Sequence, residues 1–522
     1  MKYRSKVLAI LLPAILTFSM CAHAESTAEL SAGAEGQNSQ TESVSDSGDP
    51  SGAKENNKPG DPPGEPPEGM PQPPDGNGGP GGQGAPDGNG GPGGQGENGG
   101  MQAPPDGGPG GAPGQSSADI EYKAAVEITS ASQESSQTYE STSSDENALL
   151  VATSDEVTIT DPTVSKTGDS DGGDSSNFYG LNAGILVKDG STTTITGGTI
   201  TTDASGANGV FSYGGNGGQN QAEGDGTTVI IRDTTITTTG DGSGGIMTTG
   251  GGVTYAYDLD ITTSGRSSAA IRSDRGGGEV YVDGGTYTSN GLGSPAIYST
   301  ADIQVENAVL TSNLSEGVCI EGLNSIELTD CDLTADNTQM NGNATFLDSI
   351  MIYQSMSGDA DSGTSHFTMT GGSLTSKSGH VFHVTNTNAV ITLNGVEITN
   401  EDSDNILLSV CADGWSGGSN VATLNAVSQE LSGAVKVGND SELTMELTEG
   451  STFEGLVDGT ITNAKGETVS TETGTVSVTL DGTSTWILTG DSYVTQFTGD
   501  AANVTGNGYT LYVNGEALEG IS

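Results

Sequence analysis

The residues best suited to chemistry are three arginines and one aspartate within ten positions, Arg266, Arg272, Asp274 and Arg275. A polysaccharide lyase uses a Lys or Arg side chain as the base near the acidic proton of the sugar, while calcium or another cation neutralises the uronate carboxylate. Arg272, Asp274 and Arg275 are therefore the candidate catalytic residues of such an enzyme. The alternative is a solvated outer face with local ion pairs and no catalysis.

A shallow contact with a polysaccharide or a cell-surface glycan is a further hypothesis for the same face. Arg272 and Tyr298 each follow the apolar residue that ends a repeated Ser-x-x-apolar phrase, so we expect both side chains to point outward. His383 lies one position further along its own phrase, which leaves its direction open. Arg272, Tyr298 and His383 are the predicted ligand-binding residues.

Other catalytic patterns are missing from the sequence. An inverting pectinase-type hydrolase needs clustered aspartates, and the chain contains no Asp-Asp pair. It also has no nucleophile elbow, no phosphate-binding loop after a strand and only four histidines. We therefore predict a non-catalytic protein, with a polysaccharide lyase as the alternative.

Two acidic turns offer hard oxygen ligands of the kind that calcium prefers. One turn carries Asp169, Asp171 and Asp174 among glycines, and the other runs from Glu401 to Asn405. Neither matches an EF-hand loop or a nonapeptide calcium array. Calcium is a possible ligand, solvated acidic turns are the alternative, and no other cofactor is expected.

The elements that must position these residues are the coils of a repeat. A strand-turn-strand phrase ends each time in an apolar residue followed by Thr or Ser, with steps of 23 to 26 residues and longer steps of 36 and 41. The longer steps are typical of loops inserted at the corners of a solenoid. The marker residues of this first column are Val164, Ile200, Ile236, Ile261, Tyr287, Leu310, Leu333, Leu374 and Ile398.

A second column of Ser-x-x-apolar phrases keeps the same period. Stacked coils of this length place equivalent residues about 4.8 Å apart in parallel sheets, with Ile, Val and Leu inside and Thr outside. Glycine and Asn at the corners permit positive φ. The pattern predicts an all-β, single-stranded right-handed parallel β-helix of about 12–13 coils. The apolar residues that end these phrases are Ile246, Ile271, Ile297, Val318, Val381 and Ile406.

Composition divides the chain into three parts. Residues 1–24 have the layout of a secretory signal peptide, with basic residues, a short apolar stretch and Ala22-His23-Ala24. Residues 25–117 form a predicted disordered acidic linker rich in Gly, Pro and Ser. Residues 118–522 form the predicted β-helix, with capping coils from about 475. No segment after the signal peptide is apolar enough for a membrane-spanning helix.

The formal net charge of −53 excludes nucleic acid as a partner, because such a chain repels phosphates. Three cysteines follow the signal peptide, Cys319, Cys331 and Cys411, and their spacing fits no metal motif. We expect them to be small buried residues of the core.

The phrases Tyr179 to Ile185, Ser267 to Gly278 and Thr370 to Thr375 resemble coils of secreted bacterial right-handed β-helix proteins of the adhesin-like type. This resemblance covers the region from about 150 to the C-terminus. It implies the pectate-lyase-like superfold and an extracellular or cell-surface location, but it does not imply catalysis. The leading hypothesis is an adhesin-like protein that binds glycans through its lateral face. A divergent carbohydrate-active enzyme and a purely structural spacer are the alternatives.

Overall fold

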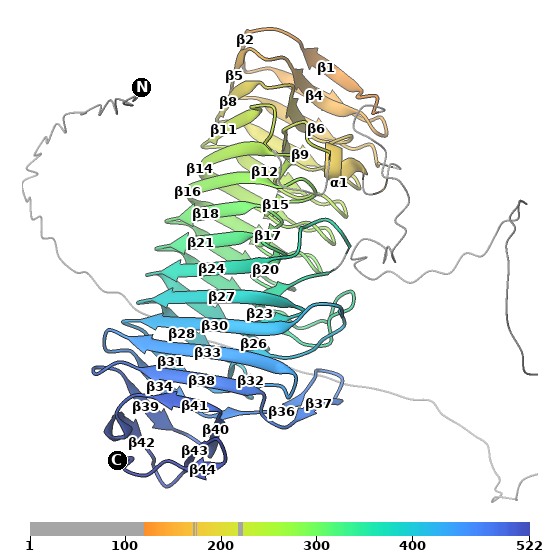
Figure 1. The fold of residues 1–522 in the computed structure, drawn as a ribbon. Coiled ribbons are helices and arrows are strands. Elements are labelled where there is room, and N and C mark those ends of the chain that lie inside the picture. The colour runs from red at the N-terminus through yellow and green to blue at the C-terminus, as the bar shows by residue number, and fades with distance from the viewer. Residues whose placement is uncertain (1–119, 171–172, 174, 218–222, 356) are drawn as a thin grey trace, which may run out of the picture. The chain divides into compact units, whose positions relative to one another are not determined.

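The computed structural model describes residues 120–522 except 171, 172, 174, 218–222 and 356, and these residues form a parallel β-helix (Figure 1). The predicted signal peptide (1–24) and linker (25–117) lie outside the described residues. Among the described residues, no helix is long and apolar enough to cross a bilayer.

Sheet A contains thirteen parallel strands from thirteen successive coils, close to the predicted number of about 12–13 coils. Its strands in stacking order are β1 (Ala124–Ile128), β4 (Asn147–Ala152), β7 (Ile185–Lys188), β10 (Val210–Tyr213), β13 (Ile246–Thr249), β15 (Ile271–Ser273), β17 (Ile297–Ser299), β20 (Val318–Glu321), β23 (Asp348–Tyr353), β26 (His380–Thr385), β29 (Ile406–Val410), β32 (Ala434–Val437) and β35 (Val457–Asp458).

Sheet B contains 22 strands in two adjoining stacks, which the long strands β14 and β16 join. The first stack is β2 (Ser132–Ser135), β5 (Glu156–Thr160), β8 (Thr192–Thr196), β11 (Thr228–Arg232), β14 (Gly252–Thr263), β16 (Gly278–Ser289), β18 (Asp302–Glu306), β21 (Ser325–Thr329), β24 (Thr364–Thr370), β27 (Thr387–Asn394), β30 (Asn420–Val427), β33 (Ser441–Thr448), β38 (Thr475–Leu480) and β41 (Gln496–Thr498). The second stack is β3 (Thr138–Ser141), β6 (Thr163–Lys166), β9 (Thr199–Thr202), β12 (Thr235–Thr238), β19 (Val309–Ser312), β22 (Asp332–Ala335), β25 (Ser373–Ser376) and β28 (Glu397–Asn400).

Three small sheets complete the C-terminal coils. Sheet C is β31 (Glu430–Ser432), β34 (Thr452–Gly455), β39 (Thr485–Leu488) and β42 (Val504–Thr505). The hairpin of β36 (Thr460–Thr462) and β37 (Thr468–Thr471) is antiparallel. In the third small sheet, β43 (Leu511–Val513) pairs parallel with β40 (Ser492–Val494) and antiparallel with β44 (Glu516–Ala517). A 3₁₀ turn spans Ala501–Asn503, and the short helix α1 spans Ser175–Tyr179.

The first repeat column is confirmed residue by residue. Each marker from Val164 to Ile398 pairs in register with the marker of the next coil, and the outward Thr or Ser after it does the same. The inserted loops therefore leave the register unchanged, as expected when an insertion lies at a corner.

The corner between the two stacks of sheet B requires a positive φ. Successive coils supply residues that tolerate this conformation, mostly Gly, Asp and Asn, because a Cβ-bearing side chain is otherwise strained there. The corner residues are Asp161 (φ 48°), Gly197 (69°), Asp233 (49°), Asp258 (50°), Gly284 (76°), Asn307 (54°), Asp330 (50°), Gly371 (63°) and Gly395 (64°).

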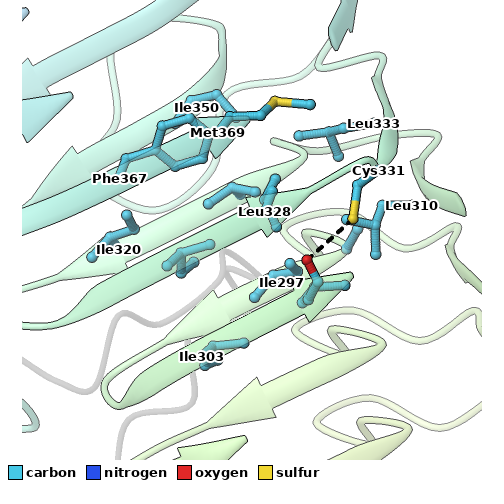
Figure 2. Packing of buried hydrophobic residues seen from close by; sticks show 14 of the residues in the cluster. Ile297, Ile303, Leu310, Ile320, Leu328, Cys331, Leu333, Ile350, Phe367 and Met369 are labelled. Carbon is cyan, nitrogen blue, oxygen red and sulfur yellow. Dashed lines mark hydrogen bonds between the residues drawn. The ribbon is translucent and has the colours of Figure 1, made fainter. Parts of the chain in front are cut away.

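The interior of the coils is a continuous ladder of buried aliphatic and aromatic side chains (Figure 2). Cys331 lies among them with a fully buried side chain, and its thiol donates to the Val305 carbonyl at 3.3 Å. Cys319 and Cys411 are also buried, and all three thiols are free. The expectation that these cysteines are small buried residues is confirmed.

A ladder of serines explains the second repeat column. The Oγ of Ser268 accepts from the Ser243 backbone N–H at 2.9 Å, and Ser294 Oγ accepts from Ser268 N–H at 2.9 Å. These hydroxyls are fully buried, so they satisfy corner N–H groups that would otherwise lack partners. The serines three residues before β13, β15 and β17 thus bond successive coils to one another.

The second column holds from Ile246 to Val318 but is wrong at its last two markers. Val318 pairs with Ile350, which pairs with Phe382, and Phe382 pairs with Leu408. The inward positions are therefore Phe382 rather than Val381, and Leu408 rather than Ile406. An irregularity between Ile406 and Leu408 accounts for part of this shift.

Candidate functional site

The outward positions of sheet A form one column of side chains that crosses all the coils. This outer column contains both Arg272 and Tyr298, as expected, and it also contains His383. His383 falls in the column because Phe382, not Val381, occupies the inward position. The members in order are Glu127, Leu150, Leu186, Phe211, Met247, Arg272, Tyr298, Cys319, Met351, His383, Ser409, Lys436 and Asp458.

A cavity of about 350 Å³ lies over the middle of the outer column. Its floor is Arg272, Tyr298, Cys319 and Met351, which are consecutive members of the column. One wall comes from the turns that precede β10, β13, β15, β17 and β20. The remaining cover comes from α1 and from segments inserted after β22, β23 and β29, which contribute Phe178, Asn341, Asp359 and Trp415.

Aromatic rings form the apolar part of the cavity. The rings of Tyr353 and Trp415 pack with their centroids 4.9 Å apart at 52°. Trp415 Nε1 is buried and has no hydrogen-bond partner among the described residues. A buried indole N–H usually finds an acceptor, so this donor is an unsatisfied polar group in the cavity wall.

The candidate catalytic residues Arg272, Asp274 and Arg275 are held in ion pairs. Arg272 Nη1 donates to the Ser267 carbonyl at 2.8 Å, and its Nη2 donates to Asp274 Oδ2 at 3.0 Å. Arg275 donates to Asp359 Oδ1 at 2.7 Å, and its guanidinium lies 4.1 Å from the ring centroid of Phe178. Both guanidinium groups are thus fixed as charged donors.

Burial raises the pKa of Asp274 to about 7, although the charge of Arg272 opposes the shift. The nearby Asp359 carboxylate adds to the increase. Glu316, another lining residue, is 5% exposed, and burial raises the pKa of its carboxyl as well. The cavity therefore contains carboxyl groups that retain protons at higher pH than solvated acids do.

Glu321 holds Tyr298 of the cavity floor and Tyr353 of the aromatic wall in place by hydrogen bonds. Its Oε2 accepts from the Tyr298 hydroxyl at 2.7 Å and from the Tyr353 hydroxyl at 3.3 Å, and its Oε1 accepts from Ser355. Burial also raises the pKa of Glu321. These bonds set the orientation of both tyrosine rings.

His383 lies outside the cavity, although it shares the outer column. Its ring stacks on Phe346 at 4.6 Å, and its side chain is fully buried. Its Nδ1 lies 2.7 Å from Ser409 Oγ, and its Nε2 lies 3.6 Å from Asp413 Oδ2, an ion-pair distance. The structure therefore brings Arg272 and Tyr298 together at the cavity and separates His383 from them.

Asp413, the partner of His383, also anchors the segment 336–347. We call this the roof segment because Asn341, Gly342 and Ala344 line the cavity. Asp413 Oδ1 accepts from Thr345 N at 2.7 Å and from Thr345 Oγ1 at 2.5 Å. Burial acts to raise the pKa of Asp413, but His383 and the bonds from Thr345 outweigh it and hold the pKa below its usual value. The hairpin β36–β37 adds a bond from Ala464 N to Thr345 O at 2.9 Å.

The acidic turns have local partners. Asp169 Oδ1 accepts from Ser205 N at 2.8 Å, while Asp171 and Asp174 lie outside the described residues. In the second turn, Asp402 accepts from the backbone of Gly379 and Asp404. Among the described residues, no three His, Cys, Asp or Glu side chains gather as they would around a metal ion.

Several lining residues were not predicted from the sequence. Phe178, Glu316, Tyr353, Asp359 and Trp415 join the cavity from inserted segments and from the margins of coils. The sequence signal for these residues was the longer spacing between some marker residues of the first repeat column, because a longer spacing shows where a coil carries an insertion. Three of the five arginines in the chain also fall at positions 266, 272 and 275, next to this cavity.

Comparison of the chain with protein-family models, with curated proteins and with solved structures finds no match. The fold and the cavity are therefore the observations from which a function can be argued.

Proposed function

We propose that this protein is an exported β-helix that binds a saccharide in the cavity over the outer column, without cleaving it. The observation that carries the proposal is the meeting of the Trp415–Tyr353 aromatic pair with the charged side chains of Arg272 and Asp274 in one cavity. Adhesion to glycan-bearing surfaces follows from this proposal, and export rests on the signal-peptide pattern of residues 1–24.

The chemistry of sugars favours such a lining. A sugar ring presents apolar C–H faces, which pack on aromatic rings, and hydroxyl groups that both donate and accept. Arg272 supplies fixed donors, and Asp274 and Glu316 supply acceptors. Buried, pre-oriented polar groups favour specific binding because little ordering is left to occur.

Binding without cleavage is favoured because the arginines do not offer a base. A guanidinium remains protonated in proteins, and those of Arg272 and Arg275 are occupied by carboxylates. His383 is buried away from the cavity beneath Phe346. Multivalent contacts between many copies and a glycan-coated surface would strengthen weak binding at single sites.

A carbohydrate-cleaving enzyme is the second candidate, and Asp274 is the observation that favours it. A carboxyl whose pKa is about 7 can donate or accept a proton at neutral pH, which is what general acid–base catalysis needs. Incubation of the purified chain with acidic and neutral polysaccharides tests this candidate. New reducing ends or unsaturated products that disappear in Asp274→Asn would establish cleavage and contradict the non-catalytic proposal.

The binding proposal is tested by applying the purified chain to a glycan array beside two variants. Trp415→Ala removes half of the aromatic wall, so we expect affinity to fall at least tenfold, the usual cost of losing a central aromatic contact. Tyr509→Ala is the matched control, since Tyr509 is exposed and does not line the cavity. An array without signal, or equal binding by Trp415→Ala and the unchanged chain, would contradict the proposal.

A further inference from the structure

A second hollow lies near the C-terminal end of the β-helix. It is a groove of about 780 Å³, lined by residues next to the hairpin β36–β37, by β40 and by the turn after β43 (Figure 1). Four strand-to-strand intervals of about 4.8 Å separate Met351 in the cavity floor from Asp458 in the groove, about 19 Å in all. The described residues that line the groove and those that line the cavity are different, so the groove is a separate place on the chain.

Tyr493 presents an aromatic ring to this groove. Its neighbours in β40, Ser492 and Val494, have buried side chains, so the side chain of Tyr493 points out of the coil. The ring stacks on that of Tyr512 in the next coil, with centroids 5.1 Å apart and planes at 7°. Tyr493 and Asp458 of the preceding coil line the groove, whereas Tyr512 does not. This arrangement indicates that Tyr512 backs one face of the Tyr493 ring and that the groove lies on the other.

The rest of the lining offers hydrogen-bond donors and acceptors. Thr473, Thr495 and Asn514 come from three different segments around the groove. Hydroxyl and side-chain amide groups both donate and accept, as sugar hydroxyl groups do. The exposed carboxyl groups of Glu472 and Asp491 lie on the same lining and would repel an anionic ligand. The chemistry of the groove therefore favours a neutral molecule rich in hydroxyl groups.

The walls of the groove are tied to the coils by hydrogen bonds. The hairpin β36–β37 is held where Asn439 N donates to Ser470 Oγ at 3.0 Å. The strand β40 is held where Val457 N donates to Ser492 Oγ at 3.1 Å. Walls that are already fixed need little ordering when a ligand binds, which favours binding.

We infer that the groove is a second binding site, which takes a neutral saccharide with one sugar ring packed on the open face of Tyr493. Aromatic rings pack on the apolar C–H faces of sugars, and the surrounding polar groups bond to the hydroxyls. The inference goes beyond the function proposed for the cavity and does not depend on it. A chain with two saccharide sites can hold two glycan chains at once, and the second contact strengthens attachment to a glycan-coated surface.

Nitration with tetranitromethane, which modifies accessible tyrosines, tests the site in the unchanged chain. Tyr493 and Tyr509 are 42% and 43% exposed, and Tyr509 does not line the groove, so it is the internal control. The probes are cello-, xylo- and manno-oligosaccharides, with oligogalacturonates as the anionic comparison. We expect at least one neutral series to slow nitration of Tyr493 and not of Tyr509, and the oligogalacturonates to slow neither, as peptide mapping would show. Nitration of Tyr493 that no neutral probe slows, or that the anionic probe slows equally, would overturn the inference.

Calorimetry in a chain that carries Trp415→Ala separates the groove from the cavity, since Trp415 lines only the cavity. The neutral probe that protects Tyr493 should still bind this chain. Adding Tyr493→Ala should lower the remaining affinity about tenfold, and adding Tyr509→Ala should leave it unchanged. Equal affinities after these two additions would overturn the groove site and leave the cavity proposal intact. Full affinity in Trp415→Ala that is lost on adding Tyr493→Ala would support the groove site and contradict the cavity proposal.

Discussion

Arg272 and Asp274 form a buried ion pair, in which Arg272 Nη2 lies 3.0 Å from Asp274 Oδ2. Of the two side chains, Asp274 is the one that loses its charge near neutral pH. Arginine keeps its charge under all ordinary conditions, whereas burial raises the pKa of Asp274 from 3.8 to about 7. Near neutral pH the charge of the cavity therefore changes when Asp274 releases its proton. The protonation of Asp274 therefore affects both ligand binding at the cavity and the stability of the coil that carries Arg272 and Asp274.

Asp274→Asn should weaken the pH dependence of stability. Between pH 4 and 7 the unfolded chain has released the Asp274 proton while the folded chain retains it, so stability falls as pH rises through this window. One group contributes at most about 1.4 kcal/mol per pH unit. Urea unfolding at several pH values should show a shallower decline for the variant. Identical slopes for the two proteins would show that Asp274 has an ordinary pKa.

Asp413→Ala should release the roof segment. The substitution removes Oδ1, which accepts both hydrogen bonds from Thr345, and the ion-pair partner of His383. Cys411, which packs with Phe346 and Ile461, should then become reactive toward maleimide, as peptide mapping would show. Cys331 is the internal control, because it lies in the core of the coils and should stay unreactive. Unchanged protection of Cys411 would mean that the hairpin β36–β37 alone holds the roof segment.

Gly372→Ala should destabilise the protein far more than Gly395→Ala. Both glycines have similar positive φ values of 67° and 64°, so backbone strain is matched. A Cβ at Gly372 would lie 2.1 Å from the Cys331 carbonyl oxygen, whereas a Cβ at Gly395 would meet nothing within 4 Å. We expect Gly395→Ala to cost about 1 kcal/mol and Gly372→Ala several times more. Equal shifts in the urea midpoint would contradict the close approach of the two coils.

Ser268→Ala should test the serine ladder. It leaves the Ser243 N–H without an acceptor in a fully buried position, which should cost about 1–3 kcal/mol. Ser325→Ala is the control, because its hydroxyl bonds only to Asp302 at an exposed site and should change stability by less than about 0.5 kcal/mol. Thermal unfolding of the two variants gives the comparison. A loss no larger than that of the control would show that water replaces the missing hydroxyl.

The fold was predictable because its determinants are local and repeated. Every coil places an apolar residue such as Ile200 or Leu333 at the same point, and stacking only requires that these points align. Insertions did not hide the pattern, since the markers resumed after each one. The exceptions were the coils containing Val381 and Ile406, where Phe382 and Leu408 take the inward positions and adjacent apolar residues make the phase ambiguous.

The cavity was only partly predictable. Arg272 and Tyr298 could be placed on one face because they follow repeat markers. Trp415 and Asp359 could not, because they lie on inserted segments whose course depends on packing between coils far apart in sequence. Position along the repeat therefore predicts the floor of the cavity, and only the folded chain identifies its cover.

The last residues of the chain lie along the final strand of sheet C. Ser522 N donates to the Val504 carbonyl at 2.8 Å, and Gly506 N donates to the Ser522 carbonyl at 2.9 Å. Parallel β-sheet otherwise offers its terminal strand as a template on which another molecule can add, as amyloid fibrils do. By occupying that strand with its own tail, the protein makes this end of sheet C unavailable as a seed for fibril growth.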